Sequence, residues 1–203
     1  MKLLLGLIFS YVLGSFPTAY IIAKKMKNVD IRHFGSGNVG ATNAARLIGY
    51  RAGSLVLLID VLKGLLPATC IAQICSSGLE TISPSQVSCL YGLAAFIGHN
   101  WSCFLGFKGG KGVATAAGVF LGVIPDAVLI AGGAWIIVVF ATRYVSLGSI
   151  LAAVAIPVLA IILNKPPEIV LISVLISSAV VYRHKSNINR LIHGAENKLR
   201  RRS

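Results

Sequence analysis

Residues 52–75 read AGSLVLLIDVLKGLLPATCIAQIC, and this apolar run establishes the class of fold. A helix needs about 20 apolar residues to cross the hydrocarbon core of a bilayer, so the run is long enough to span a membrane. Its charged residues are Asp60 and Lys63, three positions apart. Because a charge is costly in lipid, we expect them either to pair with each other as a structural bridge or to line a polar cavity.

The remainder of the chain is similarly apolar. Of its 203 residues, 56% are hydrophobic and only 12% are charged, whereas soluble domains carry about 25% charged residues. Turns at Pro125-Asp126 and Pro166-Pro167 divide the later apolar runs, and the further candidate spans are 3–23, 86–105, 112–124, 126–142, 145–163 and 168–183. The run 3–23 is too long for the core of a signal peptide, so we expect an uncleaved first span. The sequence predicts an all-α integral membrane bundle of about seven helices, with residues 1–203 in a single domain.

Basic residues gather on one side of this predicted bundle. The chain has 19 Lys and Arg against 6 Asp and Glu, and its net charge is +13. With seven spans, nearly all of the basic residues fall in alternate loops and in a tail from about residue 184, and such loops face the cytoplasm. The amino terminus then lies outside and the carboxy terminus in the cytoplasm. Confinement of the charge to short loops favours anionic lipid or substrate, and not nucleic acid, as the partner.

The first of three polar segments on this basic side reads GSGNVGATNAAR over residues 35–46. It contains a formal G-x-G-x-x-G match, but no strand precedes it, so dinucleotide binding is not favoured. We expect a helix over 39–48, capped by Ser36 or Asn38 and ended by Gly49. A helix start beside an arginine binds phosphate well, whereas the alternative is a tight interfacial loop that needs glycine only for its backbone. The side chains assigned to this site are Ser36, Asn38, Thr42, Asn43 and Arg46.

The second segment reads GHNWSCFLGFKGGKG over residues 98–112. It looks superficially like a Walker A loop, but Leu105 stands where that motif begins with glycine, and Gly112 stands where it requires Ser or Thr. Glycine nevertheless exposes backbone N–H groups to an anion, and lysine supplies charge. The alternative is a flexible cytoplasmic turn in which His99 is merely hydrogen-bonded at a helix end. The residues assigned to phosphate binding are Lys108, Gly109, Gly110, Lys111 and Gly112.

The third segment leads from the last span into the basic tail. His184, Asn187 and Arg190 recur every three residues, so a helix would place them on one side, with the apolar residues that follow toward lipid. A simple basic juxtamembrane tail is the alternative. Glu196 is the lone acidic residue of this segment.

The four cysteines form no C-x-x-C pair, and no cluster of His and Cys has zinc spacing. We therefore expect buried thiols, with a disulfide between Cys75 and Cys89 as the alternative if both lie near an oxidising face. No metal site is evident in the sequence, and no cofactor is expected.

Taken in order, the three segments resemble the motifs of the bacterial acyl-phosphate:glycerol-3-phosphate acyltransferase family. The likeness extends over nearly the whole chain, and three motifs in order on one membrane side are specific although each alone is weak. The residues that carry it are Ser36, Gly37, Asn38, Gly40, Thr42, Asn43 and Arg46, then Gly98, His99, Asn100, Lys108, Gly109, Gly110, Lys111 and Gly112, and finally His184, Asn187, Arg190, Leu191, Gly194 and Glu196.

The resemblance implies a seven-helix enzyme of the bacterial inner membrane whose active site faces the cytoplasm. It would transfer a fatty acyl chain from acyl phosphate to the 1-hydroxyl of glycerol 3-phosphate, giving lysophosphatidic acid and phosphate at the start of phospholipid synthesis. Ser36, Arg46, His184 and Asn187 would be catalytic, the second segment would bind the phosphate of glycerol 3-phosphate, and Glu196 would be structural. Membrane lipid and the enzyme that makes acyl phosphate would be further partners.

The residues suit this chemistry. Both substrates are phosphates that repel each other, so positioning them and offsetting the repulsion with cations is the main task. Either the phosphate of the donor or His184 accepts the proton of the attacking hydroxyl. The competing functions are a small membrane transporter of an organic phosphate and a lipid-binding scaffold without turnover. A transporter predicts inverted repeats and a midplane site, whereas the polar segments here cluster at one interface.

Overall fold

The computed structural model describes residues 1–76 and 81–199, and the regular elements in this part of the chain are all helical. Contacts between Cα atoms divide the chain into two compact units, Met1–Val123 and Ile124–Ser203. The predicted all-α architecture is confirmed. The boundary between the units falls beside Pro125, where the sequence predicts a turn.

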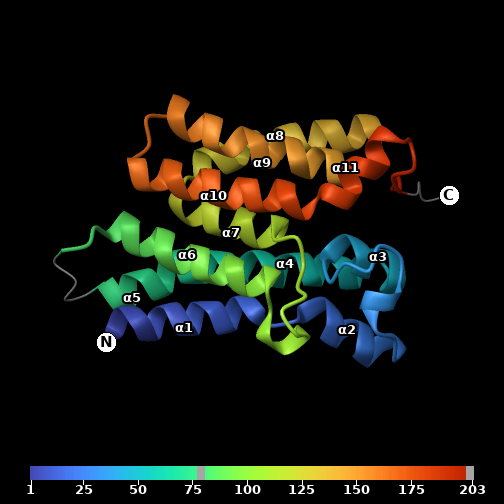
Figure 1. The fold of residues 1–203 in the computed structure, drawn as a ribbon, viewed down its shortest axis with the longest axis horizontal. Coiled ribbons are helices and arrows are strands. Elements are labelled where there is room, and N and C mark those ends of the chain that lie inside the picture. The colour runs from blue at the N-terminus through green and yellow to red at the C-terminus, as the bar shows by residue number, and fades with distance from the viewer. Residues whose placement is uncertain (77–80, 200–203) are drawn as a thin grey trace. The chain divides into compact units, whose positions relative to one another are not determined.

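The first unit is built around two long helix pairs. Its helices are α1 (Lys2–Ser15), α2 (Thr18–Lys27), α3 (Ala41–Ile48), α4 (Tyr50–Leu66), α5 (Ala72–Ser76), α6 (Pro84–Asn100) and α7 (Val113–Val123). Helix α1 lies along α6, and α4 lies along α7 with α3 packed against it (Figure 1). A π-helical turn over Pro67–Ile71 carries α4 into α5.

Glycines let these helix pairs touch backbone to backbone. A Cβ atom at Gly14 in α1 would overlap the carbonyl of Ala95 in α6, and one at Gly118 in α7 would overlap the carbonyl of Val61 in α4. Close approach of this kind increases the van der Waals contact that holds helices together in lipid. Glycine therefore sets the spacing of both pairs, and with it the position of the loops at their ends.

The first predicted span is a single run in the sequence but two helices in the structure. Helices α1 and α2 separate at Pro17, which has no N–H group to continue the helical bonds. The Nζ atom of Lys63 donates to the carbonyl oxygen of Phe16 at 3.0 Å and pairs with Oδ1 of Asp60 at 2.8 Å. Of the two roles considered for these charged residues, the structure shows the bridge between them.

The described part of the second unit consists of α8 (Pro125–Thr142), α9 (Val145–Ile162), α10 (Pro167–Arg183) and α11 (Lys185–Ile192). Helix α9 packs against both α8 and α10, and α11 bends by 56° from the end of α10 (Figure 1). In the turn before α10, Lys165 pairs with Asp126 of α8 at 3.2 Å. The predicted break at Pro166-Pro167 is confirmed.

Four helical stretches of the described chain are long and apolar enough to cross a membrane, namely Lys2–Lys27, Tyr50–Ser76, Pro125–Thr142 and Val145–Ile162. The bent pair of α10 and α11 makes a fifth when it is taken as one span. The predicted spans 86–105 and 112–124 correspond to α6 and α7, which have 17 and 11 residues. Every predicted span thus overlaps one or more helices, and four stretches of the described chain, or five with the bent pair, have the length and composition of a span.

Large apolar side chains cover the outer faces of these helices. On α8, Leu129, Ile137 and Phe140 are 73%, 70% and 90% exposed. A protein with such an apolar surface would aggregate in water, whereas lipid tails solvate the surface. The chain is therefore a multi-pass integral membrane protein.

The four cysteines are free in the structure, which shows no disulfide between Cys75 and Cys89. The prediction that all four are buried is wrong for Cys70 and Cys103, which are exposed. Cys70 lies on the π-helical turn after α4 and Cys103 on a short 3₁₀ turn, where no neighbouring helix covers them.

Candidate active site

The first motif, residues 35–46, covers the end of the loop that joins α2 to α3 and most of α3 itself. This loop shapes the start of α3. It starts at a 3₁₀ turn, Ile31–His33, which Asp30 caps by accepting the N–H of Arg32 at 2.9 Å. The Arg32 guanidinium bonds the same carboxylate at 2.7 Å, and this contact lowers the pKa of Asp30 to about 2. Because Ile31 is fully buried, the beginning of the loop is anchored in the core of the unit.

Asn43 holds the loop together from within. Its side chain is buried, its Oδ1 accepts the N–H of Ser36 at 3.3 Å, and its Nδ2 donates to the carbonyls of Phe34 and Asn38 at 2.9 and 3.0 Å. Gly35 has a φ of +57°, and a Cβ atom there would come within 2.5 Å of Asn43 Oδ1. Asn43, predicted as a binding residue, is therefore engaged with the main chain that it shapes.

The start of α3 differs from the prediction. Gly40 is the N-cap of this helix, and no side chain caps it, so the assignment of Ser36 or Asn38 as the cap is wrong. The bonds from Asn43 curl the preceding residues into a turn, so the helix begins only at Ala41. The predicted end at Gly49 is confirmed, with a φ of +106° that favours glycine. The hydroxyl of Ser36 is thereby released from capping.

This loop and α3 present polar and cationic side chains outward, beside the exposed ring of Phe34. Ser36 and Arg46 are exposed, whereas Thr42 and Asn38 are half-buried. A basic side chain in the last turn of an eight-residue helix, beside an exposed serine loop, is suited to contact an anion from the aqueous side.

The second motif closes into a narrow loop between α6 and α7. The N–H of Gly109 donates to the carbonyl of Asn100, and the N–H of Gly110 donates to that of His99, each at 3.0 Å. A Cβ atom at Gly109 would overlap the His99 carbonyl, and one at Gly110 would overlap His99 Nε2. These glycines are thus required by close packing, and their N–H groups bond within the loop. The sequence-based expectation that glycine N–H groups face an anion does not hold for Gly109 and Gly110.

The cations of this loop remain on its surface. Lys108 is exposed and Lys111 is half-buried, while Gly112, at a φ of +79°, packs against the Phe96 ring and the Asn100 amide. A rigid loop that carries two lysines outward can bind a phosphate through charge, without the backbone cradle of a P-loop.

The second motif is also bonded to the break in the first span. The hydroxyl of Ser102 donates to the carbonyl of Ser15 at 2.5 Å, and the hydroxyl of Tyr11 donates to the carbonyl of Trp101 at 2.8 Å. Neither donor was predicted from the sequence, because the partners lie 87 and 90 residues apart and no local pattern marks them.

In the second unit, Glu196 is the acceptor at the centre of the third motif. Its carboxylate accepts Asn187 Nδ2 at 2.7 Å, Ser146 Oγ at 2.8 Å and Arg190 Nε at 2.8 Å. Burial alone would raise the pKa of Glu196, but the bonds from Asn187, Ser146 and Arg190 outweigh it and lower the pKa. Because Asn187 uses its Nδ2 on this carboxylate, the orientation of its amide is fixed. Ser146 was missed because it lies on α9, 50 residues away.

His184 lies at the bend between α10 and α11 and is only 3% exposed. Its Nδ1 is 2.8 Å from the carbonyl oxygen of Val180. A carbonyl only accepts, so Nδ1 carries the hydrogen and Nε2 of the neutral ring is the basic nitrogen. The fold thereby gives His184 a defined tautomer.

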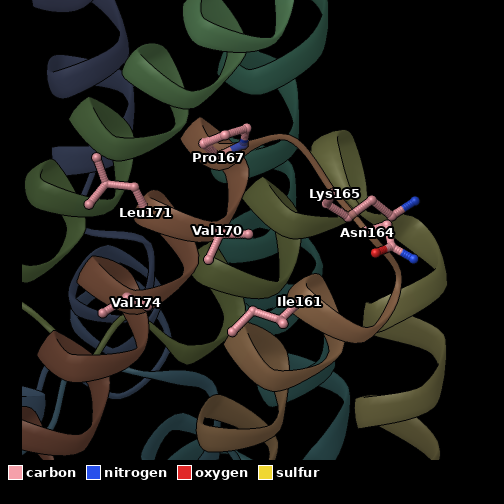
Figure 2. Close-up of a pocket in the computed structure, with 7 residues that line it drawn as sticks. All are labelled: Ile161, Asn164, Lys165, Pro167, Val170, Leu171 and Val174. Carbon is pink, nitrogen blue, oxygen red and sulfur yellow. The ribbon is translucent and has the colours of Figure 1, made fainter.

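An open depression of about 590 Å³ lies at the other end of α10. Figure 2 shows its lining, in which the apolar side chains lie to one side of the Asn164-Lys165 turn. Its lining on α10 runs from Pro167 to Val174, so the depression is about 15–25 Å along the helix from His184. No motif residue lines it, so we do not assign the reaction to it.

Comparison with known proteins identifies the family. Residues 4–194 match the family model described as glycerol-3-phosphate acyltransferase. Among curated relatives, the glycerol-3-phosphate acyltransferase of Shouchella clausii is 45% identical over 98% of this chain and 96% of its own length. That of Geotalea daltonii is 46% identical over 96% of both chains.

Solved structures agree with the sequence comparisons. The crystal structure of PlsY, an integral membrane glycerol 3-phosphate acyltransferase, in its glycerol 3-phosphate form has a TM-score of 0.89 and 40% identity, covering 98% of this chain and 96% of that one. Its lysophosphatidic acid form has a TM-score of 0.86 over the same coverage. The resemblance inferred from the three motifs is confirmed, and the chain belongs to the glycerol-3-phosphate acyltransferase family of integral membrane enzymes.

Proposed function

We propose that this chain transfers a fatty acyl group from acyl phosphate to the 1-hydroxyl of glycerol 3-phosphate, forming lysophosphatidic acid and phosphate. The observation that carries the proposal is the likeness, with a TM-score of 0.89, to PlsY in its glycerol 3-phosphate form. The second form of PlsY is named for lysophosphatidic acid, the product proposed here. Acyl phosphate is the proposed donor because the chain lacks the H-x-x-x-x-D motif of acyltransferases that use thioester donors.

In the first unit, the proposed binding residues are cations on rigid loops. Arg46 on α3 and Lys108 and Lys111 on the second-motif loop would bind the phosphate of glycerol 3-phosphate. Arginine binds two phosphate oxygens at once and lysine adds a point charge, so the set offsets the repulsion between two anionic substrates. Ser36, exposed on a loop fixed by Asn43, would donate a hydrogen bond to a substrate oxygen.

The proposed reaction is a direct transfer. The oxygen of the glycerol hydroxyl attacks the acyl carbonyl carbon, the carbon–oxygen bond to phosphate breaks, and the phosphate leaves with its electron pair. The hydroxyl proton passes to the leaving phosphate or to Nε2 of His184, whose Nδ1 is held by Val180. Asn187, oriented by Glu196, would hold the acyl carbonyl or the donor phosphate. A mixed anhydride has a good leaving group, so positioning supplies most of the catalysis.

The proposed orientation places the amino terminus outside and the basic tail in the cytoplasm of a bacterial inner membrane, with seven spans. Support comes from the basic loops, including Lys24, Lys25 and Lys27 in the last turn of α2. In this topology α6 and α7 are short spans, which a locally thinner bilayer accommodates. Reaction of a membrane-impermeant thiol reagent with a cysteine placed at Lys198, from the cytoplasmic side alone, tests the orientation.

The experiment that tests the function supplies purified protein with labelled glycerol 3-phosphate and, separately, palmitoyl phosphate or palmitoyl-CoA. Labelled lysophosphatidic acid from palmitoyl phosphate alone is the expected result. Product from palmitoyl-CoA would overturn the donor. No product from either donor, in a preparation that stays folded, would refute the reaction and lead to a transport assay with an organic phosphate.

A further inference from the structure

The break between α1 and α2 leaves backbone carbonyls outside the regular helical pattern. In an uninterrupted helix each carbonyl accepts an N–H four residues on, and Pro17 together with the change of direction at Thr18 interrupts this series. The carbonyl of Ser15 instead accepts the hydroxyl of Ser102, and the carbonyl of Phe16 accepts the ammonium of Lys63 in addition to the N–H of Thr18 at 3.0 Å. Each of these side-chain bonds ties the break to another segment of the unit, so the two bonds hold the break in place.

One donor is an ammonium group that needs a counter-charge. Lys63 bonds the Phe16 carbonyl at 3.0 Å and Asp60 at 2.8 Å, and the Lys63 and Asp60 side chains are only 5% and 2% exposed. An isolated lysine at this depth would be expelled or neutralised, and Asp60 prevents this. A polar cavity, the alternative considered from the sequence, would not explain why the Lys63 ammonium points at the carbonyl of Phe16.

The other donor belongs to the second motif. Ser102 is 2% exposed and its Oγ is 2.5 Å from the carbonyl of Ser15, the residue before Phe16. Two adjacent carbonyls are thus held by two different segments, α4 through Lys63 and the second-motif loop through Ser102.

The same helix α4 contacts the far end of the first motif. A Cβ atom at Gly53 would come within 2.5 Å of the Ala45 side chain, one residue before Arg46 on α3. The stretch from Phe16 to Ala45, which contains α2 and the first-motif loop, therefore contacts α4 near both of its ends, at Phe16 and at Ala45. The second-motif loop is attached to the same break through Ser102.

We propose that Lys63, supported by Asp60, and Ser102 are positioning residues for the acyltransferase reaction, because they hold the break in the first span and so fix the first-motif loop relative to the second. The inference rests on the proposed function, in which Arg46 on one segment and Lys108 and Lys111 on the other bind one phosphate. A misplacement of about 1 Å in such a site costs on the order of 100-fold in rate, so two modest contacts far from the substrate have a large effect.

The kinetic test compares Lys63→Met, Lys63→Arg and Ser102→Ala with the wild type. We expect Lys63→Met to raise the KM for glycerol 3-phosphate by about 10-fold and Ser102→Ala by about 3-fold, with the KM for acyl phosphate within about 2-fold. Lys63→Arg restores the donor and should recover most of the loss. Lys165→Met, which removes the Lys165–Asp126 pair of the second unit, is the matched control and should leave both constants unchanged. Unchanged constants in the Ser102→Ala and Lys63→Met proteins, or an equal rise in both, would overturn the proposal.

A second measurement does not depend on activity. Spin labels on cysteines replacing the exposed residues His33 and Phe107, in a background without the native cysteines, report the distance between the two loops. Ser102→Ala and Lys63→Met should broaden the distance distribution, and Lys165→Met should not. If the wild type fails to turn over, the proposed function fails. An unaltered distribution overturns the positioning role whether or not the enzyme is active, and Ser102→Ala decides if Lys63→Met does not fold.

Discussion

Replacing Glu196 by Gln should destabilise the second unit and impair catalysis together. The two carboxylate oxygens of Glu196 accept three donors, from Asn187, Ser146 and Arg190, at 2.7–2.8 Å. A glutamine has one acceptor oxygen, so in either orientation its NH₂ group meets at least one of these donors. Hydrogen bonds to a charged group contribute about 1.5–3 kcal/mol each, and we expect a net loss of about 2–4 kcal/mol after partial rearrangement. For a chain of this size the loss corresponds to about 4–16 °C in the unfolding midpoint.

The pH dependence of this effect has a defined sign. The pKa of Glu196 is lowered in the folded state from an ordinary value of 4.5. The stabilisation that the Glu196 carboxylate provides is therefore complete above pH 4.5. It is lost as the pH falls through the lower pKa of the folded state, because the wild-type carboxylate is then protonated, whereas the glutamine of the variant does not titrate. The gap between wild type and Glu196→Gln should be constant at neutral pH and should narrow below pH 4.5.

Thermal unfolding in detergent, followed at several pH values, measures this gap. Asp126→Asn is the control, because the Asp126–Lys165 pair lies at the surface of the same unit, where ion pairs contribute about 0–1 kcal/mol. A midpoint for Glu196→Gln within about 1 °C of the wild type, or a gap that does not narrow in acid, would refute the reasoning. The variant should also lose about 10-fold or more in kcat, because the Asn187 amide loses the carboxylate bond that orients it.

Three further changes test the first unit. Arg46→Ala should nearly abolish turnover with an unfolding midpoint close to that of the wild type, since its side chain is exposed; near-normal activity would remove Arg46 from the site. Gly110→Ala should lower kcat/KM by about 10-fold or more, because the added methyl overlaps the His99 ring. Gly132→Ala is its control and should leave kcat/KM unchanged, because the space around Gly132 is open. Asn43→Ala should lower the midpoint by about 4–10 °C, because buried bonds to the main chain are lost; an unchanged midpoint would show that other contacts hold the loop.

Much of the fold could be predicted from the sequence because hydropathy measures the free energy that governs it. Apolar runs predicted where the long helices lie, and the turns at Pro125 and Pro166 are where the helices change. The break at Pro17 was missed because the residues around it are apolar enough to belong to a continuous span. Hydropathy depends on residue type and is insensitive to whether a carbonyl keeps its own helical donor or takes one from Lys63.

The candidate site was predictable in its residue types and not in its contacts. The three motifs predicted cationic residues, a serine and a histidine at the site, because these residue types recur in proteins that bind phosphate. The wrong cap assignment for α3 shows the limit: Ser36 and Asn38 are both good caps, and the choice of Gly40 depends on a turn that Asn43 forms with residues up to 12 positions earlier. Ser102 and Ser146 carry no local signal, because each acts on a residue more than 45 positions away.

The three motifs follow one physical principle. Each loop is held by buried polar groups, Asn43 in the first, the His99 and Asn100 carbonyls in the second and Glu196 in the third. In each motif the glycines and amides hydrogen-bond to the backbone or side chains of their own loop. In the first two motifs the cations Arg46 and Lys108 lie at the surface. The proposed reaction transfers an acyl group between two substrates that each carry a phosphate. This arrangement suits it, because fixed cations stabilise the developing charge without having to reorganise. Loosening a holding residue should therefore lower activity, as removing a cation does, while only the former also lowers stability.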